Sequence, residues 1–167
     1  MTSVREIRRR KTVIQSTAQI IRGMKLIATV RLTKDRARAE AFRPYFEELR
    51  GMGAMVLEER EWPEERKGPA GIVAFTSNRG LAGGYSQQIV RMIAGDGRFL
   101  PGTAVVYAVG KRGRDSLAAM GYESRGDYSE AGERPDGVFA EKLAGRLLED
   151  YEAGEIGEIY LAYTVFR

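Results

Sequence analysis

The feature that most constrains this sequence is a long N-terminal stretch without helix breakers. Residues 3–43 contain no proline and a single glycine, Gly23. Ser3 and Glu6 have the spacing of a capping box, in which the serine hydroxyl accepts from the Glu6 amide and the carboxylate bonds back. A helix over residues 4–43 would be about 60 Å long, which is far longer than a compact domain of this size needs.

Apolar residues in this stretch recur in a pattern typical of helix packing. One apolar residue recurs every seven positions, at Ile7, Ile14, Ile21 and Ala28. Thr17 and Met24 follow three residues after two of these positions, which gives the spacing of a coiled-coil seam. A second apolar row runs beside the seam, at Val13, Ile20 and Ile27. Arginines interrupt the seam at Arg10, Arg31 and Arg38, so the helix is not a leucine zipper. Such a helix needs a partner helix or a surrounding sleeve. We expect the helix to continue to about residue 60, with Pro44 bending or interrupting it.

Charge is divided unevenly along the chain. Residues 1–43 hold 12 of the 27 Lys and Arg residues but only three of the 23 Asp and Glu residues. A basic helix is therefore attached to an acidic body. Such a helix can bind an acidic protein surface, a nucleic acid or an anionic membrane face, or its charges can simply be solvated. We favour a protein partner, because residues 1–41 contain no aromatic side chain on which bases could stack.

A glycine-rich stretch, residues 76–85, lies between an apolar run and a helical pattern. Converging amides in such a turn often bind phosphate. However, the Lys-Ser/Thr of a Walker loop does not follow Gly84, and the G-x-G-x-x-G spacing is absent. We therefore expect a structural turn, with a phosphate site as the alternative. A second candidate anion site, Lys111-Arg112-Gly113-Arg114, is more simply interpreted as a solvated turn.

The remaining sequence alternates strand and helix patterns. Strands are predicted at 71–76, 103–109 and 158–166, and helices at 84–94 and 137–151. Gly110-Lys111-Arg112-Gly113 leads into a further helix that ends near Met120, with Gly121 as the cap, and a polar loop is predicted at 124–135. This order predicts the fold class α/β, with a long N-terminal coiled-coil-type helix and a Rossmann-like body built on a parallel sheet. The predicted parts are a basic helical shaft (1–60), a linker (61–70) and the body (71–167).

Composition argues against catalysis. The chain has no His and no Cys. Its carboxylates in charged segments, Asp127 among them, are expected to be exposed and to keep ordinary pKa values. We expect no catalytic residue, no metal site and no cofactor. No apolar run is long enough to span a bilayer, and no signal sequence is recognisable, so the chain is expected to stay in the compartment where it is made.

Two motifs resemble one known family. Thr76-Ser77-Asn78-Arg79-Gly80-Leu81-Ala82-Gly83-Gly84-Tyr85 is similar to the signature Thr-Ser-Asp-Arg-Gly-Leu-Cys/Ala-Gly-Gly-Phe/Tyr-Asn of the γ subunit of rotary F-type ATP synthases, with Asn78 for Asp and Ser86 for Asn. The segments 5–10 and 16–28, and Arg43-Pro44-Tyr45, resemble its opening helix, with departures at Lys11, Ile21 and Gly23. The resemblance covers essentially the whole chain.

The resemblance implies a non-catalytic central-stalk rotor subunit, peripheral to the cytoplasmic face of the bacterial plasma membrane. It would couple proton flow through the membrane rotor ring to ATP synthesis or hydrolysis on the α/β ring. The implied partners are the α and β subunits, an ε-type subunit and the membrane c-ring, with no nucleic acid. The residues that would contact the ring are Arg8, Arg9, Arg10, Ile20, Arg22, Met24 and Lys25. The family signature, which we call the signature loop (residues 76–85), contributes Arg79, Gly80, Leu81, Gly83 and Gly84.

Family members continue into a second long helix, whereas this sequence stops at Arg167. We expect a fragment of a longer γ subunit, and a truncated γ-like protein is the alternative. A nucleotide-binding α/β protein and a nucleic-acid-binding adaptor also stay open, although neither accounts for both motifs.

Overall fold

The structure is a computed structural model that describes residues 3–58, 67–130 and 136–165. The chain divides into two compact units, Met1–Trp62 and Pro63–Arg167, which we describe one at a time. The predicted linker, 61–70, lies mostly outside the described residues, and its last residue, Ala70, is already the first residue of a strand.

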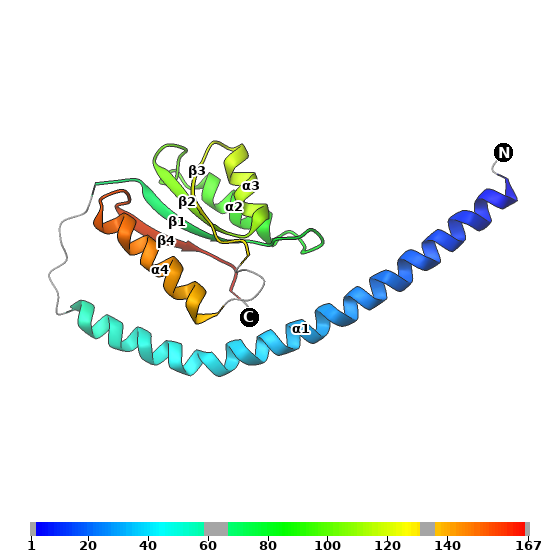
Figure 1. The fold of residues 1–167 in the computed structure, drawn as a ribbon, viewed down its shortest axis with the longest axis horizontal. Coiled ribbons are helices and arrows are strands. Elements are labelled where there is room, and N and C mark those ends of the chain that lie inside the picture. Colours follow the sequence, from blue (N-terminus) through cyan, green and yellow to red (C-terminus); the bar gives the residue numbers. More distant parts are fainter. Residues whose placement is uncertain (1–2, 59–66, 131–135, 166–167) are drawn as a thin grey trace. The chain divides into compact units, whose positions relative to one another are not determined.

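The first unit is a single helix, α1 (Val4–Glu58), of 55 residues. Figure 1 shows it as one continuous, curved helix. Pro44 lies inside α1, so the predicted interruption there is wrong. A proline removes one backbone hydrogen bond and crowds the preceding turn, and the long helical segments on both sides of Pro44 outweigh that local loss.

The start of α1 is as predicted, but its capping differs. The Ser3 carbonyl accepts from the amides of Glu6 (2.8 Å) and Ile7 (3.2 Å), while the Ser3 hydroxyl accepts from Arg5 (3.3 Å) instead of Glu6. The Glu6 carboxylate accepts from Arg10 at 2.9 Å. The predicted capping box is therefore wrong, because the carboxylate pairs with a cation one turn further along the helix.

The second unit is an α/β body with four parallel strands. The strands are β1 (Ala70–Phe75), β2 (Ala104–Val109), β3 (Glu123–Asp127) and β4 (Glu158–Ala162). They are ordered β3-β2-β1-β4, and each neighbouring pair is parallel. The helices are α2 (Tyr85–Gly95), α3 (Lys111–Ala119) and α4 (Gly137–Glu152). The predicted Rossmann-like parallel sheet is confirmed.

Two strand predictions were wrong in detail. β3 lies in a segment predicted largely as a polar loop (124–135), and β4 ends at Ala162 instead of residue 166. β3 is an edge strand, and its charged residues Glu123, Arg125 and Asp127 lie along that edge. Edge strands are commonly protected by charge, so β3 lacks the apolar pattern by which strands are recognised.

Alternate residues of the central strands supply two cores. Ile72 and Ala74 of β1 pack in a cluster with Ile89 of α2 and other residues of α2 and α3. Val73 belongs to the second cluster, with Leu143 and other residues of α4. Figure 1 shows α2 and α3 on one face of the sheet and α4 on the other. This arrangement follows from the period of two along a strand.

The end of α3 confirms the predicted glycine cap. Gly121 has φ +88°, and its amide donates to the Ala118 carbonyl at 3.0 Å, while Tyr122 donates to Leu117 at 3.1 Å. This is the Schellman pattern, which favours glycine at the left-handed position. In the described parts of the chain, no helix combines the length and apolar character needed to cross a bilayer.

Candidate functional site

The signature loop lies at the edge of the sheet where the parallel strands end. It follows β1, while Gly110 follows β2 and Ser129 follows β3. From β1 the chain proceeds to β2 and β3 on one side and returns to β4 on the other side, so the switch point of the sheet lies between β1 and β4. Open α/β sheets usually bind ligands at such a point.

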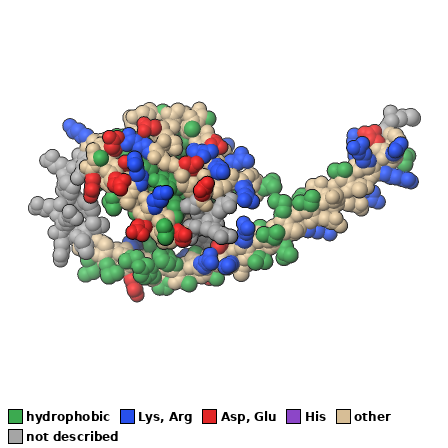
Figure 2. All heavy atoms as spheres, viewed as in Figure 1, with side chains coloured by type: hydrophobic (Ala, Val, Ile, Leu, Met, Phe, Trp, Pro, Cys, Tyr) green, Lys and Arg blue, Asp and Glu red, His purple; other side chains and the backbone are tan. Residues whose placement is uncertain are grey.

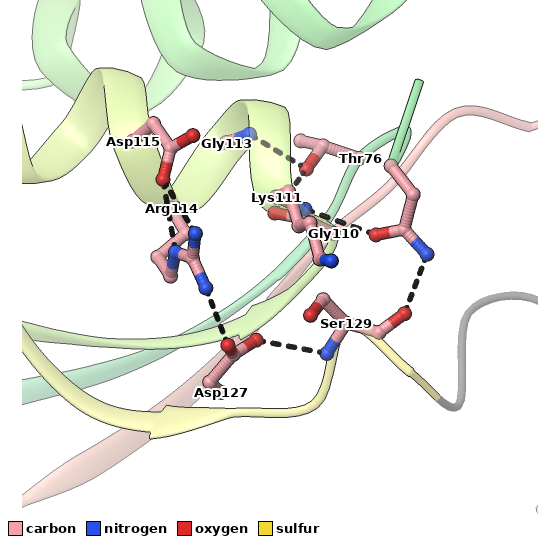
Figure 3. A network of polar contacts seen from close by, with 9 residues as sticks. Thr76, Gly110, Lys111, Gly113, Arg114, Asp115, Asp127 and Ser129 are labelled. Carbon is pink, nitrogen blue, oxygen red and sulfur yellow. Dashed lines mark hydrogen bonds and ion pairs between the residues drawn. The ribbon is translucent and has the colours of Figure 1, made fainter.

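The signature loop caps the helix that follows the neighbouring strand. The first three amides of α3 donate to successive loop residues: Lys111 to the Asn78 side-chain oxygen (3.1 Å), Arg112 to the Ser77 carbonyl (3.0 Å) and Gly113 to the Thr76 hydroxyl (2.9 Å). Figure 3 shows the Gly113 amide directed at the Thr76 hydroxyl. The N-cap residue of α3 is a glycine without a side chain, so the cap comes from a distant part of the chain.

This capping argues against an anion site at the start of α3. A phosphate at a helix N-terminus is held by the free first-turn amides. In α3 those three amides already bond to protein atoms. The cluster Lys111-Arg112-Gly113-Arg114 therefore begins a capped helix and is neither an anion site nor the solvated turn that the sequence predicted.

Two glycines permit the close approach. At Gly110 (φ +151°), an added Cβ would lie 2.1 Å from the Thr76 carbonyl oxygen, and at Gly113 it would lie 2.5 Å from the Thr76 hydroxyl. No side chain fits at such distances. The Thr76 hydroxyl also donates to the Gly110 carbonyl at 3.1 Å, which closes the contact from the other side.

Asn78 extends the network to a third loop. Its side-chain nitrogen donates to the Ser129 carbonyl at 2.5 Å, and the Ser129 amide donates to Asp127 at 3.0 Å. Arg114 forms ion pairs with Asp127 and with Asp115. Hydrogen bonds from Ser129, followed by the Arg114 guanidinium, hold the pKa of Asp127 below its ordinary value. One polar network therefore joins the loops after β1, β2 and β3.

The two ends of the signature loop are also joined. The Ser86 hydroxyl, which is buried, accepts from the Ser77 amide at 3.0 Å and lies 2.9 Å from the Ser77 hydroxyl. Gly84, the N-cap of α2, provides no side-chain cap. Ser86, one of the departures from the family pattern, thus holds the loop closed.

The tip of the loop is an exposed leucine in a left-handed conformation. Leu81 has φ +62° and is 94% exposed. A non-glycine residue in this region costs about 1–2 kcal/mol, so the surrounding structure must hold it there. Of the three signature glycines, only Gly83 has a positive φ (+70°). At Gly80 a Cβ would lie 3.1 Å from a guanidinium nitrogen of Arg112, a flexible side chain that would have to shift slightly.

All seven residues predicted to contact the ring lie on α1, which belongs to the first unit. The signature loop belongs to the second unit. Their apolar members are exposed, since Ile20 is 62% and Met24 50% accessible. No acidic residue occurs between Glu6 and Asp35, whereas eight Lys and Arg residues do. Figure 2 shows basic and hydrophobic side chains interspersed along α1.

Sequence reasoning missed one buried carboxylate. Asp150 on α4 is 5% exposed and accepts from the Tyr107 hydroxyl at 2.5 Å and from Arg146 at 3.1 Å. Burial, and then the hydrogen bond to Asp150, raise the pKa of Tyr107 well above its ordinary value. Because the carboxylate is paired on both sides, it ties α4 to β2 and is not a free base. Only the three-dimensional proximity of α4 and β2 could have revealed it.

The described residues contain neither of two further kinds of candidate site, metal-binding clusters and unpaired buried polar groups. Within residues 3–58, 67–130 and 136–165, no three His, Cys, Asp or Glu side chains come together as a metal ion would require. Across the same residues, every buried side-chain nitrogen and oxygen has a hydrogen-bond partner.

Comparison with known proteins identifies the family. The profile of the family described as ATP synthase matches residues 3–167. The chain is 40% identical over 173 residues to the ATP synthase gamma chain of Lachnoclostridium phytofermentans, covering 100% of this chain and 59% of that protein. It is 35% identical over 174 residues to the gamma chain of Moorella thermoacetica (99% and 61% covered). It is 32% identical over 175 residues to the sodium ion specific gamma chain of Acetobacterium woodii (98% and 56% covered).

The chain thus spans about three fifths of the length of these curated relatives. Both sequence motifs, the α1 seam and the signature loop, lie inside the matched region. The chain belongs to the ATP synthase family, among the gamma chains.

Proposed function

We propose that this chain forms part of the rotating central stalk of an F-type ATP synthase. It would transmit torque between ion flow in the membrane and ATP synthesis or hydrolysis on the α/β ring, without catalysing either reaction. The observation that carries the proposal is α1, a 55-residue helix whose apolar seam is exposed along its length.

The exposure of the seam supports a surrounding partner. Ile14 is 67% exposed, and Ile20, Ile21 and Met24 are each at least half exposed. Full burial of one such side chain contributes about 1.5–3 kcal/mol. A sleeve that encloses several of them would hold the helix firmly, and solvent alone would leave this apolar surface unfavourably hydrated.

The geometry of the seam also suits a shaft. Apolar positions that repeat every seven residues drift around a straight helix by about 20° per heptad. Over the three heptads from Ile7 to Ala28 the drift is about 60°, so the seam stays on one side of α1 and turns slowly around it. A slowly turning apolar seam fits a partner helix that supercoils around α1.

The charge of the helix supports an acidic inner surface on that partner. Between Glu6 and Asp35 every charged residue is a cation. We assign Arg8, Arg9, Arg10, Arg22 and Lys25 to contacts with acidic groups of the α and β subunits, and Ile20 and Met24 to apolar contacts beside them. Such contacts would bias the conformations of the neighbouring subunits, which is how a non-catalytic rotor changes catalytic sites.

The body would serve as the rigid base of the stalk. We assign its remaining contacts to an ε-type subunit and the membrane c-ring, at the cytoplasmic face of a bacterial plasma membrane. The signature loop, with Arg79, Gly80, Leu81, Gly83 and Gly84, would be one fixed contact surface, because its polar network holds an exposed Leu81 in place. The coupling ion is a proton in this proposal, although one relative is described as sodium ion specific.

A chimaera tests the function directly. In a bacterial ATP synthase, the matching three fifths of the native gamma chain would be replaced by residues 3–167 of this chain. We expect the chimaeric enzyme to couple ATP hydrolysis to ion pumping. A complex that assembles and hydrolyses ATP but pumps no ions would overturn the proposal.

Charge reversal then tests the shaft contacts. Arg22→Glu with Lys25→Glu should reduce coupled pumping in the chimaera at least tenfold, because like charges would face each other in the ring. Arg91→Glu with Lys142→Glu changes the net charge equally, on exposed positions of α2 and α4. This control should leave pumping nearly unchanged, and equal losses in both double variants would argue against a specific role for α1.

A further inference from the structure

The side chain of Asn78 lies between two backbone groups with opposite hydrogen-bonding roles. The Lys111 amide can only donate, and it donates to the Asn78 oxygen at 3.1 Å. The Ser129 carbonyl can only accept, and it accepts from the Asn78 nitrogen at 2.5 Å. Since both neighbours have fixed roles, the amide has only one orientation that satisfies both contacts.

We propose that Asn78 is a positioning residue for the signature loop, and that this chain requires an amide there and not a carboxylate. An ionised aspartate has acceptors only. At position 78 it could still accept from Lys111, but its second oxygen would face the Ser129 carbonyl, another acceptor.

Burial makes the exchange costly. Ser129 is 2% exposed, so water cannot readily replace the lost donor. A buried carbonyl that loses its partner bears the full cost of its desolvation. The effect should nevertheless be local, because the Thr76 and Ser77 contacts with α3 do not involve the Asn78 side chain.

The residue most affected should be the loop tip. Asn78 lies three residues before Leu81, whose left-handed backbone needs support from its surroundings. The Ser77–Ser86 contact joins the two ends of the loop. Losing the Ser129 contact therefore removes one attachment close to the tip, and the tip should become more mobile while the body stays folded.

The first experiment uses the native chain. Asn78 is the only asparagine in the sequence, so labelling with 15N-asparagine yields a single side-chain amide in the NMR spectrum. We expect its two protons to be well separated in shift and its exchange with solvent to be slower than in an unfolded control at the same pH. Exchange as fast as in the unfolded control would overturn the proposal.

The second experiment compares Asn78→Asp, Asn78→Ala and the native chain at pH 7 and pH 4. At pH 7 we expect Asn78→Asp to lower the thermal midpoint by about 5 °C, and amide exchange in residues 79–84 to become faster. At pH 4 the protonated carboxyl regains a donor, so the deficit relative to the native chain should shrink. Asn78→Ala has no donor at either pH, and its deficit should stay constant.

Other ionisable groups near the loop are present in every variant. These groups are Arg79, Lys111, Arg112, Arg114, Asp115, Asp127 and Glu130. Comparison at equal pH removes their contribution. Gln88→Glu introduces the same amide-to-carboxylate change on exposed α2 and should leave midpoint and exchange unchanged. A pH-independent deficit in Asn78→Asp, or none at pH 7, would refute the proposal, and neither readout depends on the stalk function.

Discussion

At the scale of the residue, one missing Cβ determines how closely two loops can meet. Gly110 places its Cα so near the Thr76 carbonyl that an added Cβ would lie 2.1 Å from the oxygen. Its φ of +151° is also unfavourable for any residue with a side chain. The capping of α3 by the signature loop therefore depends on glycine at this position.

Gly110→Ala should destabilise the body by at least about 2 kcal/mol, because both the clash and the backbone strain oppose it. Urea unfolding followed by circular dichroism measures the loss. Gly145→Ala, in the interior of α4 with nothing within 4 Å of the added Cβ, is the matched control. It should be neutral or stabilising by up to about 1 kcal/mol. Similar losses in both variants would contradict the role assigned to Gly110.

Tyr107 gives the body a dependence on alkaline pH. Its folded pKa is raised by burial, and by the hydrogen bond to Asp150, above the unfolded value of about 10. The associated stability is complete below pH 10 and is lost as the pH rises beyond it. Tyr107→Phe should lower the unfolding free energy at pH 7 by about 1–2 kcal/mol and weaken the decline above pH 10. If the loss of stability above pH 10 were unchanged in this variant, other tyrosines and not Tyr107 would cause it.

At the scale of the element, patterns local in sequence were predictable and long-range pairings were not. The part of α1 before Pro44 followed from the absence of helix breakers, and the end of α3 followed from Gly121. The β3 strand was missed because charges along a sheet edge resemble a loop. The contacts of Asn78 were out of reach because their partners lie 33 and 51 residues away.

The α1 seam provides a test on a single helix. Met24→Lys places a cation in the apolar row, where burial inside a ring would be unfavourable. We expect impaired ATP-driven rotation in the chimaeric enzyme, with unchanged helix content by circular dichroism. Gln19→Lys adds the same charge on the opposite side of α1 and should retain rotation. Normal coupled pumping by the Met24 variant would remove this residue from the mechanism.

The substitution Gly23→Ala tests whether glycine at this position of α1 serves contact with a partner at the expense of helix stability. An alanine there meets nothing within 4 Å, and it should stabilise the helix by about 1 kcal/mol. Thermal unfolding of α1, followed by circular dichroism, measures this gain. If Gly23 instead allows a partner to approach closely, the more stable variant should assemble less well with the α and β subunits.

At the scale of the whole molecule, the order of strand and helix patterns and two sequence motifs were enough to predict the fold class and the family. A basic helix and an α/β body are distinguishable from residue order alone, and the resemblance assigned both to one family. The composition could not show that the glycine-rich loop caps α3. That role became visible only from the positions of the α3 amides.

Salt should separate the two forces proposed for assembly. Contacts between exposed charges weaken as ionic strength rises, whereas apolar burial does not. We expect binding of the chimaeric gamma chain to an α/β ring to weaken by about tenfold between 0.05 and 0.5 M salt. Salt-independent binding would mean that the apolar seam alone holds the helix.

The cap of α3 has a consequence for how the body folds. A helix with its own capping side chain can form early, from local interactions. The first turn of α3 can instead be capped only after β1 and β2 lie side by side, because the atoms that accept hydrogen bonds from its amides belong to residues 76–78. During synthesis these acceptors emerge before the helix, and Ser129 emerges after it. Assembly of the body should therefore be cooperative, with few partly folded forms that persist.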